Sequence, residues 1–304
     1  MAESSQDSTT TAVSPNRVAE VKGWFFTTDD SQTALRQDIF SLQVDIRLHV
    51  RTLETVPPHL RAIYEGVVSI EPDFFSTLLL IHRLEWLRTT AQPRETVQEL
   101  WNYMVGLDIE HFHVKMRALM DYAAHAVAGA ADHFGQIPGE SFYELYEWTN
   151  KSEGNCRRLG MELASLVRSA SWLMELRDIR DAVVHRGGRV MGFGNPEDGI
   201  LFQVYRRASI NPIVQRAPFM SNKHVVDFQL YAAFYLAELL MFLKRLTDYI
   251  RTRFTLQQIG RGGRLLGPGT EVFHAWLTRL EEVMKPEENQ GEPLISLSGI
   301  GGCP

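Results

Sequence analysis

The stretch LRDIRDAVVHRGG, residues 176–188, combines side chains that could bind phosphate and transfer protons. Arg180 is always charged and can bind a phosphate through two parallel donors. His185 can take up and release a proton near pH 7, which contributes about 10²–10⁴ in rate in general acid–base catalysis. Asp181 could fix the tautomer and orientation of the histidine ring. Together, residues of these types can cleave RNA without a metal: a base activates the ribose 2′-hydroxyl, the arginine holds the phosphate and an acid protonates the leaving 5′-oxygen.

The spacing of the three residues limits how they can meet. On a helix, positions five apart point about 140° away from each other, so Arg180 and His185 diverge. Asp181 and His185 are four apart and share a face. A distorted helix end at the following glycines, or a second subunit across a two-fold axis, would bring arginine and histidine together. A purely structural role stays open, with His185 at an interface beside Asp181 and Arg180 paired with Glu175 or Asp181.

The motif RDAVVH, residues 180–185, resembles the Arg-polar-x₃-His signature of HEPN domains (higher eukaryotes and prokaryotes nucleotide-binding). Three expected helices, at 108–131, 161–179 and 224–254, resemble the compact helical bundle of that superfamily. The resemblance covers about half of the chain, residues 108–256. An aspartate after the arginine departs from the asparagine or histidine that is common in the family.

The resemblance implies a metal-independent endoribonuclease whose site forms at a homodimer interface, as in toxin–antitoxin, abortive-infection and other defence systems. Arg180 would bind phosphate, His185 would transfer protons, and Asp181 would orient or polarise the histidine ring. RNA, a second copy of the chain and an antitoxin or other protein are the implied partners, and no cofactor or metal is implied. The alternative is a non-catalytic HEPN-like module that binds a partner protein or a nucleotide.

The charge distribution favours a surface that binds a polyanion. Net charge is −6, but residues 177–264 carry fourteen Lys and Arg against seven Asp and Glu, a local balance of +7. Residues 199–226 and 249–270 contain no acid. Such asymmetry suits a nucleic-acid-binding face, although chance clustering on a solvated surface is the alternative. The candidate phosphate- or RNA-binding residues are Arg177, Arg186, Arg189, Arg206 and Arg207.

Composition indicates a globular, cytoplasmic protein. The chain has 304 residues, 44% hydrophobic and 22% charged, which is the ordinary globular range. No apolar run is long enough to cross a bilayer, and no signal-peptide pattern opens the sequence. Cys156 and Cys303 lie too far apart in the sequence to suggest a zinc site or a structural disulfide.

Hydrophobic periodicity predicts a mostly α protein, a HEPN-like helical bundle with extra N-terminal helices and one small β-hairpin at 189–205 after the motif. The expected organisation is a disordered segment at 1–30, an N-terminal helical region at 31–107 with helices at 32–55, 72–90 and 94–105, the bundle at 108–256, and a C-terminal helix at 269–284 with a flexible tail within 257–304.

Three other patterns could suggest a metal or ligand site, but each has a structural interpretation that is simpler. Asp108, Glu110, His111 and His113 suggest a metal site, but His111 and His113 diverge on a helix, so a polar helix start is the expectation. Glu271 and His274 have the Glu-x-x-His spacing found in di-iron helical bundles, but this pair alone is not enough for a di-iron site, which needs two such pairs. The aromatic residues of the long helix, Phe228, Tyr231, Phe234 and Tyr235, have core spacing and are expected to pack.

Overall fold

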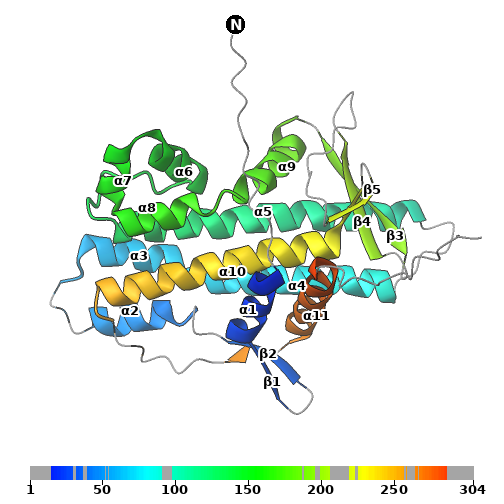
Figure 1. Cartoon of the computed structure of the whole chain (residues 1–304), viewed down its shortest axis with the longest axis horizontal. Coiled ribbons are helices and arrows are strands. Elements are labelled where there is room, and N and C mark those ends of the chain that lie inside the picture. Colours follow the sequence, from blue (N-terminus) through cyan, green and yellow to red (C-terminus); the bar gives the residue numbers. More distant parts are fainter. Residues whose placement is uncertain are drawn as a thin grey trace, which may run out of the picture.

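The computed structural model describes residues 15–29, 32–36, 40–51, 53, 55–90, 98–186, 188–195, 199–205, 219–222, 225–256, 258, 264–265 and 267–285. This part of the chain is mostly helical and contains two small antiparallel sheets (Figure 1). The mostly α fold class is therefore confirmed. None of the described helices is both long and apolar enough to cross a membrane.

The described elements follow one another along the chain. The helices are α1 (Pro15–Phe25), α2 (Leu42–Val50), α3 (Pro58–Val68), α4 (Ile70–Thr89), α5 (Gln98–Ala130), α6 (Phe142–Lys151), α7 (Glu153–Leu159), α8 (Met161–Arg168), α9 (Leu173–Arg186), α10 (Phe228–Arg253) and α11 (Pro268–Met284). The strands are β1 (Phe26–Asp29), β2 (Gln32–Arg36), β3 (Arg189–Asn195), β4 (Gly199–Tyr205), β5 (Met220–Asn222), β6 (Val225–Asp227) and β7 (Arg264–Leu265).

Helix α10 forms the centre of the fold. Every residue from Phe228 to Leu243 is buried, so apolar side chains cover all sides of the helix. Asp227 caps its start by accepting hydrogen bonds from the backbone N–H groups of Gln229 and Leu230, at 3.0 and 3.2 Å. The expectation that the aromatic residues of this helix pack in the core is confirmed, for example by the rings of Tyr231 and Tyr235, 4.5 Å apart.

Helix α5 corrects the expected boundary at residues 107 and 108. The sequence predicts separate helices at 94–105 and 108–131, whereas one continuous helix spans Gln98–Ala130. A helical glycine such as Gly106 costs only about 1 kcal/mol. Burial of Val105 and Ile109 on either side of it keeps the helix intact. The expected N-terminal region and bundle therefore share one helix and are not separate units.

The N-terminal segment is more structured than expected. The sequence predicts disorder for residues 1–30 and a helix at 32–55, but α1, the β1–β2 hairpin and α2 occupy most of 15–50. Val21 and Phe25 of α1 are buried, and Phe26 pairs with Leu35 across the hairpin. Arg17 donates to Glu238 of α10 at 2.8 Å. These contacts join residues far apart in sequence, which local periodicity does not reveal.

The described part of the C-terminal segment packs on the N-terminal elements. Strand β7 pairs with β2, completing a sheet of order β1-β2-β7. The helix predicted at 269–284 is confirmed as α11, and its Phe273 ring lies 5.5 Å from that of Phe26. The expected tail beyond residue 285 lies outside the described residues.

The hairpin predicted at 189–205 is confirmed as β3 and β4, which pair from Arg189–Tyr205 to Asn195–Gly199. It belongs to a four-stranded sheet of order β3-β4-β6-β5. Strands β5 and β6 were not predicted, because runs of three residues carry too little alternation to be recognised.

Strand β3 lies directly against α5. A Cβ atom added to Gly106 would lie 2.5 Å from the backbone oxygen of Val190, and one added to Gly192 would lie 2.4 Å from Val105. The backbone N–H of Val190 donates to Glu110 of α5 at 3.1 Å. This close approach positions the strand that follows the motif helix.

We expect Gly106→Ala to destabilise the protein. The added methyl group would collide with a strand carbonyl, and overpacking of this kind costs about 1–3 kcal/mol, more than the ~1 kcal/mol gained in helix propensity. Chemical denaturation measures the free energy of unfolding. Gly23→Ala in α1 is the matched control, because nothing lies within 4 Å of its added Cβ and its stability should not fall. If Gly106→Ala left the free energy of unfolding unchanged, the close packing of α5 against β3 would be contradicted.

Candidate phosphate-binding site on helix α9

Helix α9 carries the motif and presents one side to the core. Leu176, Ile179 and Ala182 recur at helical spacing and are all buried. The helix expected at 161–179 is in fact two helices, α8 and α9, separated by a turn at 169–172. In that turn the Ser169 hydroxyl donates to the carbonyl of Leu166 at 2.7 Å, which satisfies a group at the end of α8.

The end of α9 agrees with the helix stop expected at the glycines. The backbone N–H of Gly188 donates to the carbonyl of Ala182 at 2.9 Å. This bond reaches back six residues, beyond the four-residue spacing of the α-helix, so the regular hydrogen-bond pattern has ended there. The chain then enters β3 at Arg189. Position 185 therefore lies in the last helical turn, immediately before the sheet.

Three arginines meet at the carboxylate of Asp181. Arg180 donates to Oδ1 at 2.9 Å, Arg177 lies 3.4 Å from Oδ2, and Arg117 of α5 lies 3.6 Å from Oδ1. The Arg180 guanidinium thus turns back towards the neighbouring residue. Positions 181 and 185 share one face of the helix. The contact with Asp181 therefore brings the positive charge of Arg180 towards the face that carries position 185.

The arginines set the charge state of Asp181. Partial burial alone would raise the pKa of its carboxyl, but the hydrogen bond from Arg180 and the charges of Arg177, Arg180 and Arg117 together lower the pKa below its ordinary value. The carboxylate is therefore ionised throughout the neutral range. Its side chain is 16% exposed, so solvent reaches the cluster.

Neighbouring side chains position the arginines. The guanidinium carbon of Arg177 lies 3.5 Å from the centre of the Tyr143 ring, a cation–π arrangement. Arg117 also pairs with Asp121 at 3.4 Å, and Asp121 accepts from the backbone N–H of Phe142 at 2.9 Å. Three guanidinium groups thus lie around the Asp181 carboxylate, and that of Arg117 also contacts Asp121.

The structure places only some of the candidate residues in this cluster. Arg180, Asp181 and Arg177 lie together as expected, and the paired role that the sequence left open for Arg180 is realised with Asp181. Glu175 instead accepts from the hydroxyl of Tyr235. Arg189 is exposed on β3. Arg206 and Arg207, and the side chains of His185 and Arg186, lie outside the described residues.

Sequence reasoning missed Arg117 and Tyr143. Arg117 is 64 positions before Asp181, on another helix, and Tyr143 lies on α6. The one local signal was the i, i+4 spacing of Arg117 and Asp121, which indicates a helix-surface pair and gives no indication of a contact with α9.

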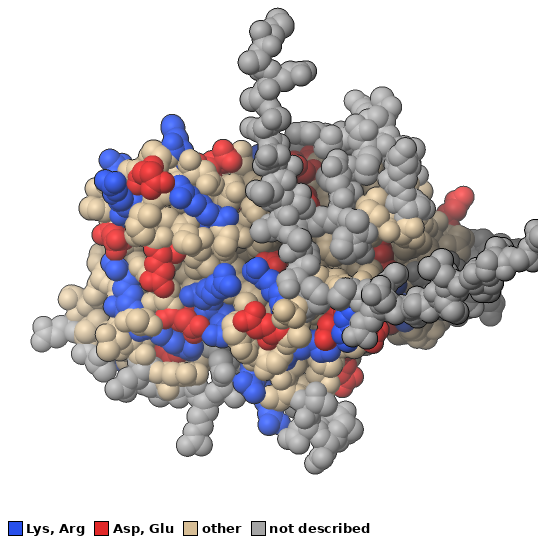
Figure 2. Space-filling model, viewed as in Figure 1, with Lys and Arg blue, Asp and Glu red and all other residues tan. Residues whose placement is uncertain are grey.

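The expected basic face is only partly supported, because arginines of the acid-free stretch 249–270 are paired with distant acids. Arg251 donates to Asp45, whose carboxylate is fully buried, at 2.7 Å. Arg253 pairs with Asp132 at 2.9 Å. Figure 2 shows basic and acidic side chains interspersed on the face it draws. The other acid-free stretch lies mostly outside the described residues.

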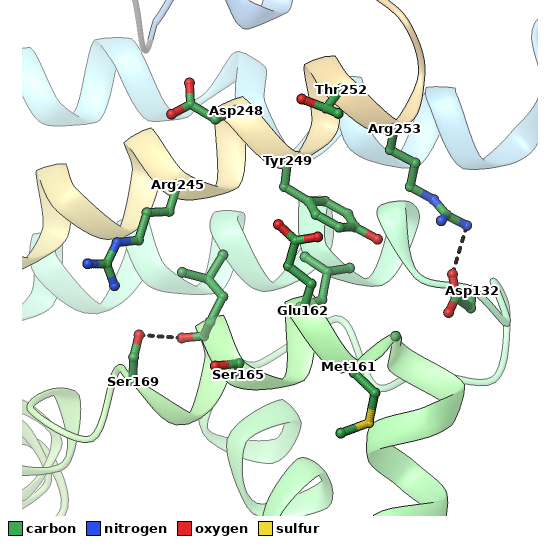
Figure 3. Close-up of a pocket in the computed structure, with 13 residues that line it drawn as sticks. Asp132, Met161, Glu162, Ser165, Ser169, Arg245, Asp248, Tyr249, Thr252 and Arg253 are labelled. Carbon is green, nitrogen blue, oxygen red and sulfur yellow. Dashed lines mark hydrogen bonds and ion pairs between the residues drawn. The ribbon is translucent and has the colours of Figure 1, made fainter.

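A separate cavity of about 780 Å³ lies between α8 and the C-terminal part of α10. Figure 3 shows Arg245 at one end of it, Glu162 and Tyr249 in the middle, and the Arg253–Asp132 pair at the other end. Ser165 and Ser169 add hydroxyl groups to the lining. Neither Arg180 nor Asp181 is among the described residues that line this cavity, so it is distinct from the Asp181 cluster.

No protein-family model, curated protein or solved structure matches this chain. The chemistry of the Asp181 cluster and of the cavity is therefore inferred from their own residues.

The DIEHFH segment is not the polar helix start that the sequence suggested. Asp108 lies ten residues into α5, where it is buried and accepts from Arg83 at 2.7 Å, and Glu110 binds β3. His111 is exposed. Among the described residues, no three or more His, Cys, Asp and Glu side chains are grouped to hold a metal ion.

His113 is a buried, neutral histidine. Its Nδ1 lies 2.7 Å from the carbonyl of Ile109 and its Nε2 lies 2.9 Å from the Tyr231 hydroxyl. A carbonyl can only accept, so Nδ1 carries the proton and Nε2 accepts from Tyr231. Burial lowers the pKa of His113 to about 4, although the hydrogen bond to Ile109 opposes that change.

His113 is expected to make folding stability depend on pH. Its pKa is about 4 when folded and 6.5 at its ordinary value, so the unfolded chain binds more protons between these limits. The contribution is complete above pH ~6.5 and is lost as the pH falls to about 4, by up to about 3 kcal/mol. In His113→Gln, denaturation should show a weaker pH dependence in this window, while exposed His133→Ala retains it. Identical pH dependence in wild type and His113→Gln would contradict this assignment.

Proposed function

We propose that the chain is a metal-independent endoribonuclease whose site is built on helix α9. The observation that carries the proposal is the meeting of three guanidinium groups at Asp181, one helical turn before His185. Such a cluster suits the phosphate of an RNA backbone, because arginine donors match phosphate oxygens in geometry and charge. The resemblance of RDAVVH to the HEPN signature supports the same reaction.

The arginines would bind the scissile phosphate at the exposed edge of the cluster. Their side chains are 22–32% exposed, so each can keep its contact with protein while offering donors to solvent. As the reaction proceeds, negative charge accumulates on the phosphate oxygens, and fixed positive charges stabilise that state more than the ground state. Asp181 holds the guanidinium groups together and keeps them oriented before RNA arrives.

His185 would carry the proton transfers. A base removes the proton from the ribose 2′-hydroxyl, and the oxygen attacks the adjacent phosphorus. The bond from phosphorus to the 5′-oxygen breaks, and an acid gives that oxygen a proton. The products are a 2′,3′-cyclic phosphate and a free 5′-hydroxyl. A single histidine can perform one of the two transfers, and a second histidine or water performs the other.

The test is cleavage of a mixed RNA pool with chelator present. Wild type should cut RNA and leave cyclic phosphate ends, and His185→Ala and Arg180→Ala should each lose at least about 100-fold in rate. His133→Ala and Arg245→Ala are matched controls, because both residues are exposed and lie outside the cluster. The proposal fails if folded wild type leaves RNA intact, or if both motif variants cut as wild type does.

Asp181→Asn separates two roles for the aspartate. If the carboxylate orients the site, the variant loses activity while RNA binding stays the same. If it competes with phosphate for the arginines, the variant binds RNA more tightly and its affinity depends more steeply on salt, because more charge is free to displace counterions.

A second candidate function is nucleotide binding without catalysis, favoured by the cavity between α8 and α10. Arg245 and the hydroxyl of Ser165 suit a phosphate group, and the half-buried Tyr249 offers an aromatic surface for a base. This module would use the cavity and leave RNA whole.

Calorimetric titration with ATP tests this second candidate. Binding should weaken at least about 10-fold in Arg245→Ala and Tyr249→Ala, since each would remove a direct contact. Arg180→Ala is the matched control and should bind as wild type does. Absence of ATP binding, or equal binding by all variants, would exclude the cavity as the nucleotide site.

A further inference from the structure

We propose that the face formed by α4, α5 and β3 docks a second copy of this chain. Of fifteen exposed large apolar side chains among the described residues, nine lie on these three elements. They are Phe75, Leu79 and Trp86 on α4, Leu100, Tyr103, Met104, Leu107 and Val114 on α5, and Met191 on β3. Scattered exposed apolar residues need no explanation, but a concentration of this kind marks an interaction surface.

The residues form two stripes. On α4 the spacing of four and seven between Phe75, Leu79 and Trp86 keeps them on one side of the helix. On α5 the exposed positions Leu100, Met104, Leu107 and Val114 are separated by four, three and seven, with the same result. Each stripe therefore runs along its helix for several turns.

The two stripes lie on the same side of the α4–α5 layer. Ion pairs between Arg83 and Asp108, and between Asp73 and Lys115, fix the two helices side by side and antiparallel. In this register Phe75 lies level with Val114, and Trp86 level with Met104. Arg83 lies between Leu79 and Trp86 on the exposed side of α4, and its partner Asp108 is next to Leu107 of the α5 stripe. The two stripes therefore adjoin across this ion pair.

Charge is sparse on this face. The exposed charged residues of α4 and of α5 up to Val114 are Arg83 and Glu99, and the Arg83 guanidinium is bound to Asp108. Interface centres are depleted of charge and enriched in aromatic side chains and methionine, as this face is. Arg189 of β3 is exposed and lines the hollow beside Met191, but the two stripes themselves are apolar, so the chemistry of the stripes fits another apolar protein surface.

The exposed area matches what a stable dimer buries. At about 200 Å² for each large apolar side chain, with exposures of 39–62%, the nine residues expose on the order of 800 Å². Each partner in a standard stable interface buries about 800 Å². The largest apolar patch on a typical monomer is smaller, about 300–600 Å².

The shape of the face suits a two-fold axis. A hollow of about 560 Å³, lined by Tyr103, Leu107 and Met191 among others, lies between α5 and β3. Trp86 lies at the same level on the opposite side of the α5 stripe, and it is 48% exposed. A two-fold axis parallel to α5 would place Trp86 of each copy over the hollow of the other. Such a contact is isologous and closes at a dimer.

Sedimentation equilibrium of the full chain tests the proposal. Wild type should be a dimer at micromolar concentration, and Leu107→Glu and Trp86→Ala should each raise its dissociation constant at least about 30-fold. The matched controls Val283→Glu on α11 and Trp24→Ala on α1 change equally exposed residues away from the face and should leave the dimer intact. Circular dichroism checks that each variant is folded.

Three outcomes overturn the proposal. A wild-type monomer at all concentrations would show that the face does not bind a second copy. A dimer that survives both Leu107→Glu and Trp86→Ala would place the interface elsewhere. Equal dissociation in test and control variants would show a loss of general stability and no specific contact. None of these outcomes depends on RNA cleavage, so the dimer and the ribonuclease stand or fall separately.

Discussion

The burial of helix α10 on all sides is the constraint on which the rest of the structure depends. A polar side chain on such a helix must find a partner, because an unpaired buried polar group is costly. Glu238 pairs with Arg17 of α1, Tyr231 with His113 of α5, and Tyr235 with Glu175 of α9. Each contact fixes a surrounding helix against the centre. The contact with Glu175 places the start of the motif helix, so the site is oriented from the core outward.

Two kinds of arginine–aspartate contact occur in the fold: a buried pair that joins two helices, and a partly exposed aspartate shared by several arginines. Asp45 is fully buried and its contact with Arg251 joins α2 to the end of α10, where removal of either partner of a buried ion pair is costly. Asp181 remains partly exposed and is shared by three arginines from two helices. A shared, partly exposed carboxylate therefore holds three positively charged groups close together at a position that solvent reaches.

The elements that sequence periodicity predicted well are those whose buried faces are long and regular. The predictions for α4, α11, the β3–β4 hairpin and α10 agree closely with the structure, because their apolar spacing repeats over enough residues to be recognised. Strands β1, β2, β5, β6 and β7 have two to five residues each, too few for alternation to be recognised, and β7 forms by pairing with the distant β2. The α5 helix continues through Gly106 because packing on both sides outweighs local propensity.

As with the fold, local sequence patterns predicted only the part of the candidate site that lies on one element. Local spacing indicated Arg180, Asp181 and Arg177 together, because all three lie on one helix. Arg117 enters only through the packing of α5 against α9, which no local pattern encodes. The paired states of Arg251 and Arg253 likewise come from tertiary contacts, so counting charges along the sequence overestimated the positive surface available to a polyanion.

The packing of β3 against α5 limits how this chain can associate with other molecules. Strand β3 is at the edge of its sheet, and an open edge presents unpaired backbone groups that recruit strands from other molecules and lead to aggregation. Here the backbone of α5 at Gly106 lies against the carbonyl of Val190, and Glu110 takes up the N–H of the same residue. The helix thereby closes the edge to strand addition, and association on this side must proceed through side chains.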